Sequence, residues 1–466
     1  MFCLADCAAA HAWLPVALAQ EMALGWPLAT IVYGALVVLL AVLPAAAFAI
    51  AAQVFSQESR AMFAPLALAA GAPLAGIAAQ YLVGFAWNSA GYSALATPLA
   101  SLYSTFGVHG VAALVTLTAG TAGAALAEFA WRRDLAAAAR GLQGLTLLIV
   151  VLVAAFVTNY LAREPQPSVA LRARLVQPAV TQLAKFDGER MRAIARQLAT
   201  LARDDSAQLV VAPETALPHA WSALPDDVSN SLLEVVAGGD RLWLLGMFEV
   251  DPELGLLNVS NGLRANSRDA APQHYIKHRL VPVAERPTAG LRWLSDALAL
   301  RYPARAESDD LSVVFRVSGV GVRTTICLDL AFGGDLSATA AATGVIVNQS
   351  NLAALPGERV RAQFTTIARV RALEQRKPLL LVANDGPTAV IDADGAVLAS
   401  LPAGRDGAVT REVVARDGST LYATLGEGSW LTLLAFAALG VVLRRMLAES
   451  RALQSSNRPD ARKAPT

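Results

Sequence analysis

Long apolar segments and one large polar region divide this chain. Between residues 1 and 130 the only charged side chains are Asp6, Glu21, Glu58, Arg60 and Glu128. A helix that crosses the hydrocarbon core of a bilayer needs about 20 predominantly apolar residues. Five segments meet that length, namely residues 28–55, 62–83, 107–129, 141–162 and 428–447. The pattern predicts a membrane protein, and residues 1–20, interrupted by Asp6 and His11, are a weaker candidate for a further span.

Basic residues predict how these segments are oriented. One basic run, residues 132–140, lies between two predicted spans, and another follows the last predicted span. Loops that are rich in Lys and Arg face the cytoplasm. The parts that we expect are, in order, a transmembrane helical domain of about four to six spans in residues 1–162, an extracytoplasmic domain in residues 163–425, a C-terminal transmembrane helix in residues 426–447 and a cytoplasmic polar tail in residues 448–466.

The polar region alternates between strand and helix patterns. "VALRARLVQPAV" (169–180) has the alternation of a strand, whereas "ERMRAIARQLATLARDD" (189–205) has the apolar spacing of a helix. "LSVVFRVSGVGVRTTICL" (311–328) predicts a hairpin with Gly at its turn. "RVRAQFTTIARVRALEQRK" (359–377) predicts an amphipathic helix that ends before Pro378. These alternating patterns, with apolar strands, indicate an α/β domain with buried strands.

Composition narrows the class of protein. Hydrophobic residues make up 55% of the chain and charged residues 16%, and the mean hydropathy is +0.45, which is typical of a membrane protein. The net charge of +1 provides no field that would favour nucleic acid. The sequence contains no phosphate loop, no dinucleotide glycine fingerprint and no paired Cys/His metal spacing. The cysteines Cys3, Cys7 and Cys327 do not suggest a disulfide framework.

Three residues with side chains suited to catalysis follow predicted strands. Glu214 ends "LVVAPE", Lys277 lies in "HYIKHRLVPV", and Cys327 ends "VRTTIC". A carboxylate can act as the base for a thiol, and an ammonium can stabilise the oxyanion of acyl transfer. Each residue also has a plain structural interpretation: Cys327 as a packing residue, Glu214 as a turn acid, and Lys277 as one basic residue among several. Spacing alone does not decide between these interpretations.

The motifs around these residues resemble the nitrilase (carbon–nitrogen hydrolase) superfamily and, within it, the membrane branch of the apolipoprotein N-acyltransferases. "APETALP" contains Glu214, "YIKHRLVPVAERP" contains Lys277 and Glu285, and "TTICLDLAF" contains Cys327. "ARVRALEQRKPLLLVANDGPTAVIDADG" is similar to later blocks of that family. The likeness runs in order from about residue 80 to the C-terminal apolar helix.

The resemblance implies a fold and a mechanism. The fold would be α/β, a nitrilase-like αββα four-layer sandwich attached to a multi-span α-helical membrane domain. Glu214 would take the proton of Cys327, the thiolate would attack a phospholipid ester, and Lys277 would stabilise the oxyanion. The amine of a diacylglyceryl-cysteine at a lipoprotein N-terminus would then take the acyl chain from the thioester. Glu285 and Asp329 would have supporting roles.

The resemblance also implies the setting of the reaction. No metal and no organic cofactor would be required. The partners would be a phospholipid acyl donor, a diacylated apolipoprotein acceptor and membrane lipids, with no nucleic acid, and the protein would act as a monomer. It would lie in the bacterial cytoplasmic (inner) membrane as a multi-pass protein, with the catalytic domain facing the periplasm or the cell exterior.

The chain departs from the family pattern at two places. Asp329 stands where the family has a glutamate, and Leu328 stands where it has a tyrosine; the shorter acid retracts its carboxylate by one methylene. Residues 352–357, "LAALPG", lack the acid and the aromatic residue that commonly follow "SN" in the family. Two alternatives therefore stay open: a membrane-anchored nitrilase-type amidase or a specialised acyltransferase with another acceptor, and a catalytically inactive relative that acts as a scaffold.

Overall fold

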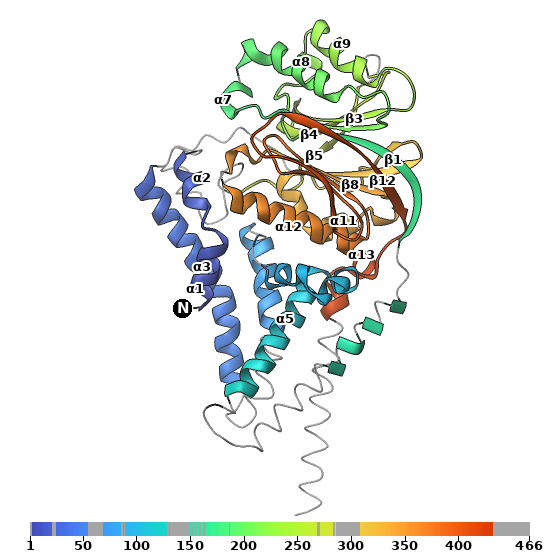
Figure 1. The fold of residues 1–466 in the computed structure, drawn as a ribbon. Helices are drawn as coiled ribbons and strands as arrows, with labels where there is room; N and C mark the ends of the chain where they lie inside the picture. The colour runs from blue at the N-terminus through green and yellow to red at the C-terminus, as the bar shows by residue number, and fades with distance from the viewer. Residues whose placement is uncertain are drawn as a thin grey trace, which may run out of the picture.

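Two six-stranded sheets form the centre of the polar region in this computed structural model (Figure 1). The structure describes residues 2–20, 25–54, 69–84, 87, 89–127, 130, 149–150, 152–154, 156–157, 160–161, 165–185, 187–267, 271–282, 285, 308–355 and 357–431. The strands of the first sheet are, in spatial order, β12 (Gly407–Asp417), β1 (Gln166–Gln177), β2 (Leu209–Val211), β3 (Leu242–Asp251), β4 (Gly255–Leu263) and β5 (Gln273–Ile276). Those of the second sheet are β11 (Val397–Leu401), β10 (Thr388–Ile391), β9 (Leu379–Ala383), β8 (Val345–Ser350), β7 (Val320–Ile326) and β6 (Phe315–Val317).

Both sheets are mixed. In the first sheet, β1, β2 and β3 run parallel, with Ala173 opposite Leu209 and Leu209 opposite Leu242, and the outer pairs are antiparallel. In the second sheet, β7, β8 and β9 run parallel, with Val347 opposite Leu380, and the outer pairs are again antiparallel. Parallel strands are covered on both faces, which explains the continuous apolar runs of these central strands.

The alternation of side chains along each strand fills two different cores. In β2, Leu209 and Val211 pack between the two sheets, whereas Val210 faces the opposite side and packs under a helical layer. Two helices, α8 (Met191–Ala202) and α9 (Asp226–Leu233), form that layer over the first sheet (Figure 1). Successive residues point to opposite faces of a strand, so a fully apolar strand serves both cores.

A long helix covers the second sheet. Helix α12 (Glu358–Gln375) begins after Gly357, and the residue that follows it, Arg376, adopts the left-handed conformation ahead of Pro378. Its Val360, Phe364 and Ile367 join the core that contains the strands of the second sheet. The layers are therefore helix, sheet, sheet, helix, and the predicted αββα sandwich is present.

Shorter elements also lie in the described part of the chain. They are the helices α7 (Gln182–Lys185), α11 (Gly333–Ser337) and α13 (Leu421–Leu425), the π-helix η1 (Ala79–Val83), and the 3-10 helices η2 (Ala90–Ala96), η3 (Pro98–Leu102), η5 (Gly188–Arg190), η6 (Trp221–Ala223), η7 (Glu234–Val236), η8 (Cys327–Ala331), η9 (Ala340–Ala342) and η10 (Leu352–Ala354).

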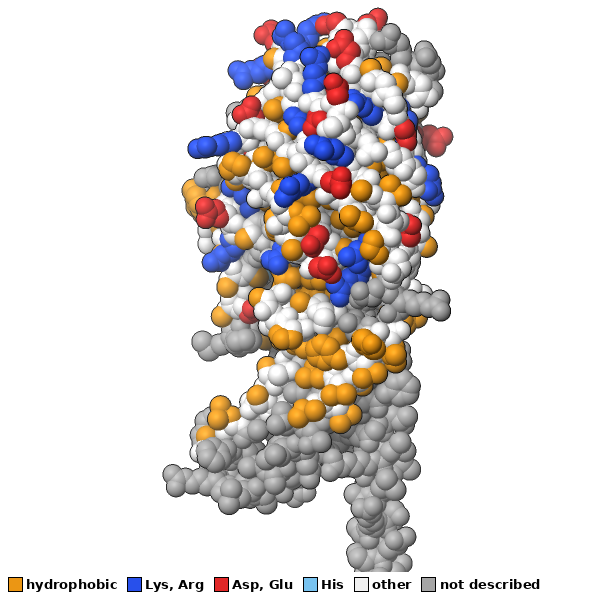
Figure 2. All heavy atoms as spheres, turned by 45° about the vertical axis from the view of Figure 1, so that its right-hand side comes forward, with side chains coloured by type: hydrophobic (Ala, Val, Ile, Leu, Met, Phe, Trp, Pro, Cys, Tyr) orange, Lys and Arg blue, Asp and Glu red, His pale blue; other side chains and the backbone are white. Residues whose placement is uncertain are grey.

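The N-terminal part is helical and apolar. Its helices are α1 (Phe2–Ala10), α2 (Leu14–Gln20), α3 (Trp26–Val54) and α5 (Tyr103–Ala127). Among the described residues, two helical segments are long and apolar enough to cross a membrane, Trp26–Ala46 and Pro98–Gly123; the second is mostly buried. Figure 2 shows apolar side chains gathered at this end of the molecule, whereas charged side chains of both signs cover the sheet domain.

The sequence predictions compare with these elements as follows. The helix predicted at 359–377 and the hairpin predicted at 311–328 are confirmed by α12 and by the antiparallel pair β6–β7. Apolar segments 28–55 and 107–129 correspond to α3 and α5, although Gly107 interrupts α5 with a left-handed φ of 65°. The segments 141–162 and 428–447, the tail 448–466 and the basic run 132–140 fall wholly or largely outside the described residues, so the proposed domain limits stay predictions.

Candidate active site

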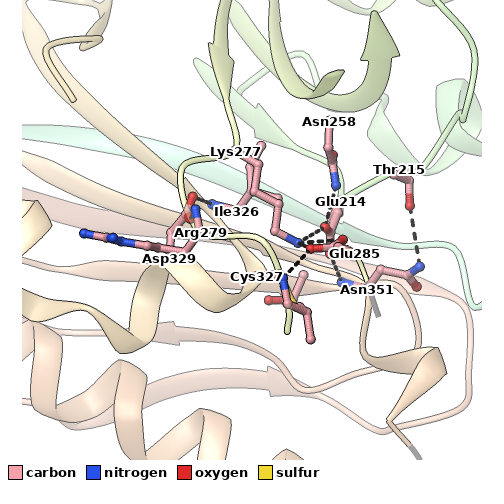
Figure 3. A network of polar contacts seen from close by, with 12 residues as sticks. Glu214, Thr215, Asn258, Lys277, Arg279, Glu285, Ile326, Cys327, Asp329 and Asn351 are labelled. Carbon is pink, nitrogen blue, oxygen red and sulfur yellow. Dashed lines mark hydrogen bonds and ion pairs between the residues drawn. The ribbon is translucent and has the colours of Figure 1, made fainter. Parts of the chain in front are cut away.

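The residues expected to carry chemistry meet at the ends of strands from both sheets (Figure 3). Glu214 follows β2 and Lys277 follows β5 in the first sheet, while Cys327 follows β7 in the second. A side chain on the second sheet joins the two layers here, because Gln349 donates to the backbone carbonyls of Ala212 (2.6 Å) and Leu244 (3.2 Å). The site therefore lies between the sheets, where neither sheet alone could build it.

Lys277 is held between two carboxylates. Its Nζ lies 2.8 Å from Glu214 Oε1 and 2.9 Å from Glu285 Oε2. Burial lowers the pKa of Lys277, but the charges of Glu214 and Glu285 outweigh it and raise the pKa above the ordinary value. The side chain is therefore a permanent ammonium at neutral pH, although only 1% of it is exposed.

Glu214 is oriented by donors as well as by the lysine. Asn258 of β4 donates its amide to Glu214 Oε1 at 2.7 Å, and the backbone N–H of Asn351 donates to Glu214 Oε2 at 2.9 Å. Each carboxylate oxygen thus has a defined partner. The residue after Glu214, Thr215, adopts a left-handed φ of 45°, which is uncommon for a β-branched residue and is typical of constrained functional sites.

Cys327 is buried beside these charges in a strained turn. It is 6% exposed and has a left-handed φ of 48°, which lies outside the favoured regions of a non-glycine residue. Burial raises the pKa of the thiol, and the charge of Glu214 raises it further, whereas Lys277 and a hydrogen bond from the Asn351 backbone lower it. The thiol is thus protonated at neutral pH in this state, and a base must remove the proton before it can react.

Asp329 supports the turn that carries Cys327. Its carboxylate accepts hydrogen bonds from the Tyr275 hydroxyl (2.9 Å), the Ile326 backbone N–H (2.9 Å) and the Arg279 backbone N–H (2.6 Å). Burial raises the pKa of Asp329, and the Ile326 N–H opposes this by favouring the charged form. The shorter acid is fully engaged here, so the methylene that it lacks relative to the family pattern does not leave it without partners.

Glu285 is the second carboxylate on the lysine. Its Oε2 also accepts the Val281 backbone N–H at 2.8 Å, within the same loop that follows Lys277. The loop thereby holds Glu285 over Lys277 (Figure 3). Residues 286–307, which continue this loop, lie outside the described part of the chain.

Three further polar residues contribute to the site without having been assigned a role from sequence. Asn258 lies in β4, "GLLNVSNGL", whose polar residues do not by themselves point to Glu214, and Asn351 contacts Glu214 through its backbone N–H, so neither side chain indicates its contact. Lys185 of α7 is fully buried; burial lowers its pKa to about 7, and the charges of Glu214 and Asp385 oppose that shift. Tertiary contacts alone bring these residues to Glu214.

The segment after Asn351, residues 352–357, contains no polar side chain. Leu352 is fully buried in the core, and Leu355 packs against it. Residues 352–354 form the short helix η10. Among the described residues, no group of three or more His, Cys, Asp or Glu side chains is placed to hold a metal ion.

A comparison of the sequence with protein families identifies this arrangement. The carbon–nitrogen hydrolase profile matches residues 172–421, more than half of the chain and the whole of the segment with Glu214, Lys277 and Cys327. The chain belongs to the carbon–nitrogen hydrolase family. Residues 1–121 of this carbon–nitrogen hydrolase match a second profile, the apolipoprotein N-acyltransferase N-terminal domain. Both matches agree with the resemblance in the site motifs.

Curated relatives of this carbon–nitrogen hydrolase carry the same name as the second profile. The apolipoprotein N-acyltransferase of Bordetella bronchiseptica is 28% identical over 80% of this chain and 72% of its own length. That of Shewanella oneidensis is 26% identical over 78% of this chain and 70% of its own length. These relatives place the chain in the N-acyltransferase branch of the family, as predicted.

Solved structures are also similar to part of this carbon–nitrogen hydrolase. One is Saccharomyces cerevisiae Nit3, a member of branch 10 of the nitrilase superfamily, which is 15% identical at a TM-score of 0.41 over 54% of this chain and 93% of that chain.

Proposed function

We propose that the protein transfers an acyl chain from a phospholipid, through a thioester on Cys327, to the N-terminal amine of a diacylglyceryl-cysteine lipoprotein. The observation that carries this proposal is the contact of Glu214 with Lys277, both buried beside a strained cysteine. The relatives named apolipoprotein N-acyltransferase support the choice of reaction.

The first half-reaction would form the thioester. Glu214 removes the proton of Cys327 as the sulfur attacks the ester carbonyl, because the buried thiol holds its proton at neutral pH. The C–O bond to the glycerol oxygen then breaks, and Glu214 returns the proton to that oxygen. The products are a lysophospholipid and an acyl-Cys327.

Lys277 would stabilise the oxyanion. An ammonium has three N–H donors, and the contacts to Glu214 and Glu285 use two of them. We assign the third to the oxygen that becomes negative in the tetrahedral intermediate. Glu285 holds Lys277 in its charged form, and Asp329 holds the turn that carries Cys327.

The second half-reaction would consume the thioester. The neutral amine of the acceptor attacks the acyl carbon, and Glu214 takes the proton that the nitrogen loses. The C–S bond breaks, and that proton passes to the Cys327 sulfur, which restores the enzyme and leaves an amide. Both substrates are lipids, which fits the presence, in the part of the chain that the structure describes, of two helical segments long and apolar enough to cross a membrane. We infer a multi-pass protein of the bacterial cytoplasmic membrane with its site on the outer side.

An experiment with two readouts tests this proposal. Purified enzyme is incubated with phospholipid that carries a labelled acyl chain, and hydroxylamine-labile label is sought on the peptide that contains Cys327. A diacylated lipopeptide is then added, and we expect the label to move to its N-terminal amine. The variant Cys7→Ala, altered outside the site, is the control and should behave as wild type. Absence of label on Cys327 in an enzyme that acylates the lipopeptide would refute the thioester.

A second candidate keeps the thioester on Cys327 but changes the acceptor or, for an amidase, also the acyl donor. The segment after Asn351 has apolar Leu352 and Leu355, without the acid and the aromatic residue that the family commonly has there. This favours an acyltransferase for another amine, or an amidase that uses water. Label that forms on Cys327 but does not move to the diacylated lipopeptide would support this second candidate. Complementation of a bacterium depleted of its own N-acyltransferase distinguishes the two in cells.

A further inference from the structure

Arg371 and Glu374 of α12 form a buried ion pair that the proposed chemistry does not use. Their side chains are 1% and 0% exposed, and the guanidinium contacts the carboxylate directly. Replacing such a pair by apolar residues is often neutral for stability, since desolvation offsets the attraction. The hydrogen bonds that the pair makes to other elements therefore indicate what it does.

Arg371 binds the far end of the turn that begins at Cys327. Its Nε donates to the Leu330 carbonyl at 3.0 Å, and its Nη2 donates to the Ala331 carbonyl at 3.1 Å. These are the last two residues of η8, Cys327–Ala331. Asp329 binds the other end of the turn through the Ile326 N–H. The strained backbone of Cys327 is thus held from both sides.

Glu374 binds the start of an apolar helix. Gly107 breaks α5 with φ 65° and ψ −179°, so the helical run resumes at Val108. The first N–H groups of a helix have no partner within it, and a carboxylate at that end is favoured by the helix dipole. The Val108 N–H donates to Glu374 Oε1 at 2.7 Å. Within the described ranges, two helical segments are long and apolar enough to cross a membrane, and residues 98–123, which include this start, are one of them.

We propose that the Arg371–Glu374 pair is a positioning device that fixes the Cys327 turn to the N-terminal end of the helical segment 108–127. Arg371 also donates to the Tyr92 hydroxyl at 3.0 Å, so η2 is held by the same ion pair. The device rests on the proposed role of Cys327 as nucleophile. It would set the position of the sulfur relative to this apolar helix.

Two adjacent glycines provide a matched test that leaves both charges in place. A Cβ at Gly333 would overlap the Arg371 guanidinium and lie 2.8 Å from Glu374 Oε2, whereas a Cβ at Gly334 would meet only the Tyr81 hydroxyl, at 3.5 Å. Gly333→Ala therefore displaces the pair, and Gly334→Ala is its control. Two further variants extend the test. Arg371→Lys keeps the positive charge but loses the planar guanidinium with its several N–H donors. The double variant Arg371→Met with Glu374→Leu removes both charges, so that no unpaired charge is left buried.

The readouts are acyl transfer from labelled phospholipid, the rate of iodoacetamide alkylation of Cys327 against pH, and thermal unfolding, all on the full chain. Loss of one charge-assisted hydrogen bond corresponds to about a tenfold change. We expect kcat to fall about tenfold with little change in KM for Gly333→Ala, Arg371→Lys and the double variant. Cys327 should at the same time become more reactive, because a loosened turn lets water reach the thiol and moves its pKa down toward the ordinary value. Gly334→Ala should match wild type.

The outcomes separate this inference from the proposed function. A lower melting temperature with unchanged kcat and an unchanged alkylation profile would mean that the pair is merely structural. A fall in kcat with an unchanged alkylation profile would mean that Arg371 does not act through Cys327. Either result overturns the positioning role. Failure of the proposed function would instead leave wild type without a labelled Cys327 thioester, while the alkylation profiles still report on the turn.

Discussion

At the scale of single residues, the site consists of buried side chains of opposite charge. Lys277 stays charged because two carboxylates surround it, and Cys327 stays protonated because it is buried and Glu214 is negative. Charges interact more strongly in such a site than in water. The same carboxylate therefore suppresses the thiolate at rest and is available to accept its proton during reaction.

Removal of either partner in proton transfer should stop turnover. We expect Cys327→Ala and Glu214→Gln each to lower acyl transfer by about a thousandfold or more, because one lacks the nucleophile and the other lacks the base. The measurement is transfer of labelled acyl chain by purified protein, with circular dichroism to check the fold. Arg203→Met, which removes an exposed ion pair with Glu234, is the control. Normal turnover by Cys327→Ala would rule out the assigned nucleophile.

The pH dependence of Cys327 alkylation should depend on the sign of the charge on each neighbouring side chain. An ordinary cysteine titrates at about 8.5, and the raised pKa of Cys327 places its midpoint above that value. Glu214→Gln removes a charge that disfavours the thiolate and should move the midpoint down. Lys277→Met removes a charge that favours it and should move the midpoint up. The rate of iodoacetamide modification, followed on the Cys327 peptide by mass spectrometry, checks both shifts, and a shift of equal sign in both variants would contradict the electrostatic account.

At the scale of elements, a close approach of two backbones positions the base. Residues 212–217 run along β3, with the Ala212 N–H donating to the Leu244 carbonyl and the Leu217 N–H donating to the Gly246 carbonyl. Gly246 lies directly against this segment, because a Cβ there would come within 2.7 Å of both Glu214 Cα and Thr215 N. A glycine within a strand is a mark of such an approach.

A methyl group at Gly246 should therefore displace the base. We expect Gly246→Ala to lower kcat by at least about tenfold and to destabilise the fold by about 1–3 kcal/mol, as overpacking does. Gly407→Ala on β12 is the matched control, since its Cβ would meet only Leu401 at 3.8 Å. Kinetics and thermal unfolding of both variants check this. Equal behaviour of the two variants would show that the contact at Gly246 does not position Glu214.

At the scale of the whole molecule, charged and apolar surfaces are segregated. The sheet domain carries the charged side chains, and the described helical end is apolar on its surface (Figure 2). Helix α3 exposes Trp26, Ile31 and Val42, each more than half exposed, as a helix in contact with lipid does. Helix α5 instead packs under α12 and α13 (Figure 1).

The predicted orientation can be tested independently of catalysis. Because basic residues follow the last predicted span, we expect a fluorescent reporter fused after Thr466 to be active and an alkaline phosphatase fused there to be inactive. Phosphatase inserted at the exposed turn of Asp394 should show the reverse pattern. Activity of the phosphatase at Thr466 would reverse the assigned topology.

The sequence by itself determined the family, the α/β class and the three candidate residues that follow their strands, because local motifs and apolar periodicity encode all of these. It also predicted α12 and the β6–β7 hairpin, whose signals are local. Only the tertiary structure decided which groups surround them. Asn258 reaches Glu214 through the pairing of strands in the first sheet, the Asn351 N–H through the stacking of the two sheets, and the Arg371–Glu374 pair reaches the Cys327 turn through helix packing. Contacts between residues far apart in the chain depend on how layers meet, and a local pattern carries no information about that.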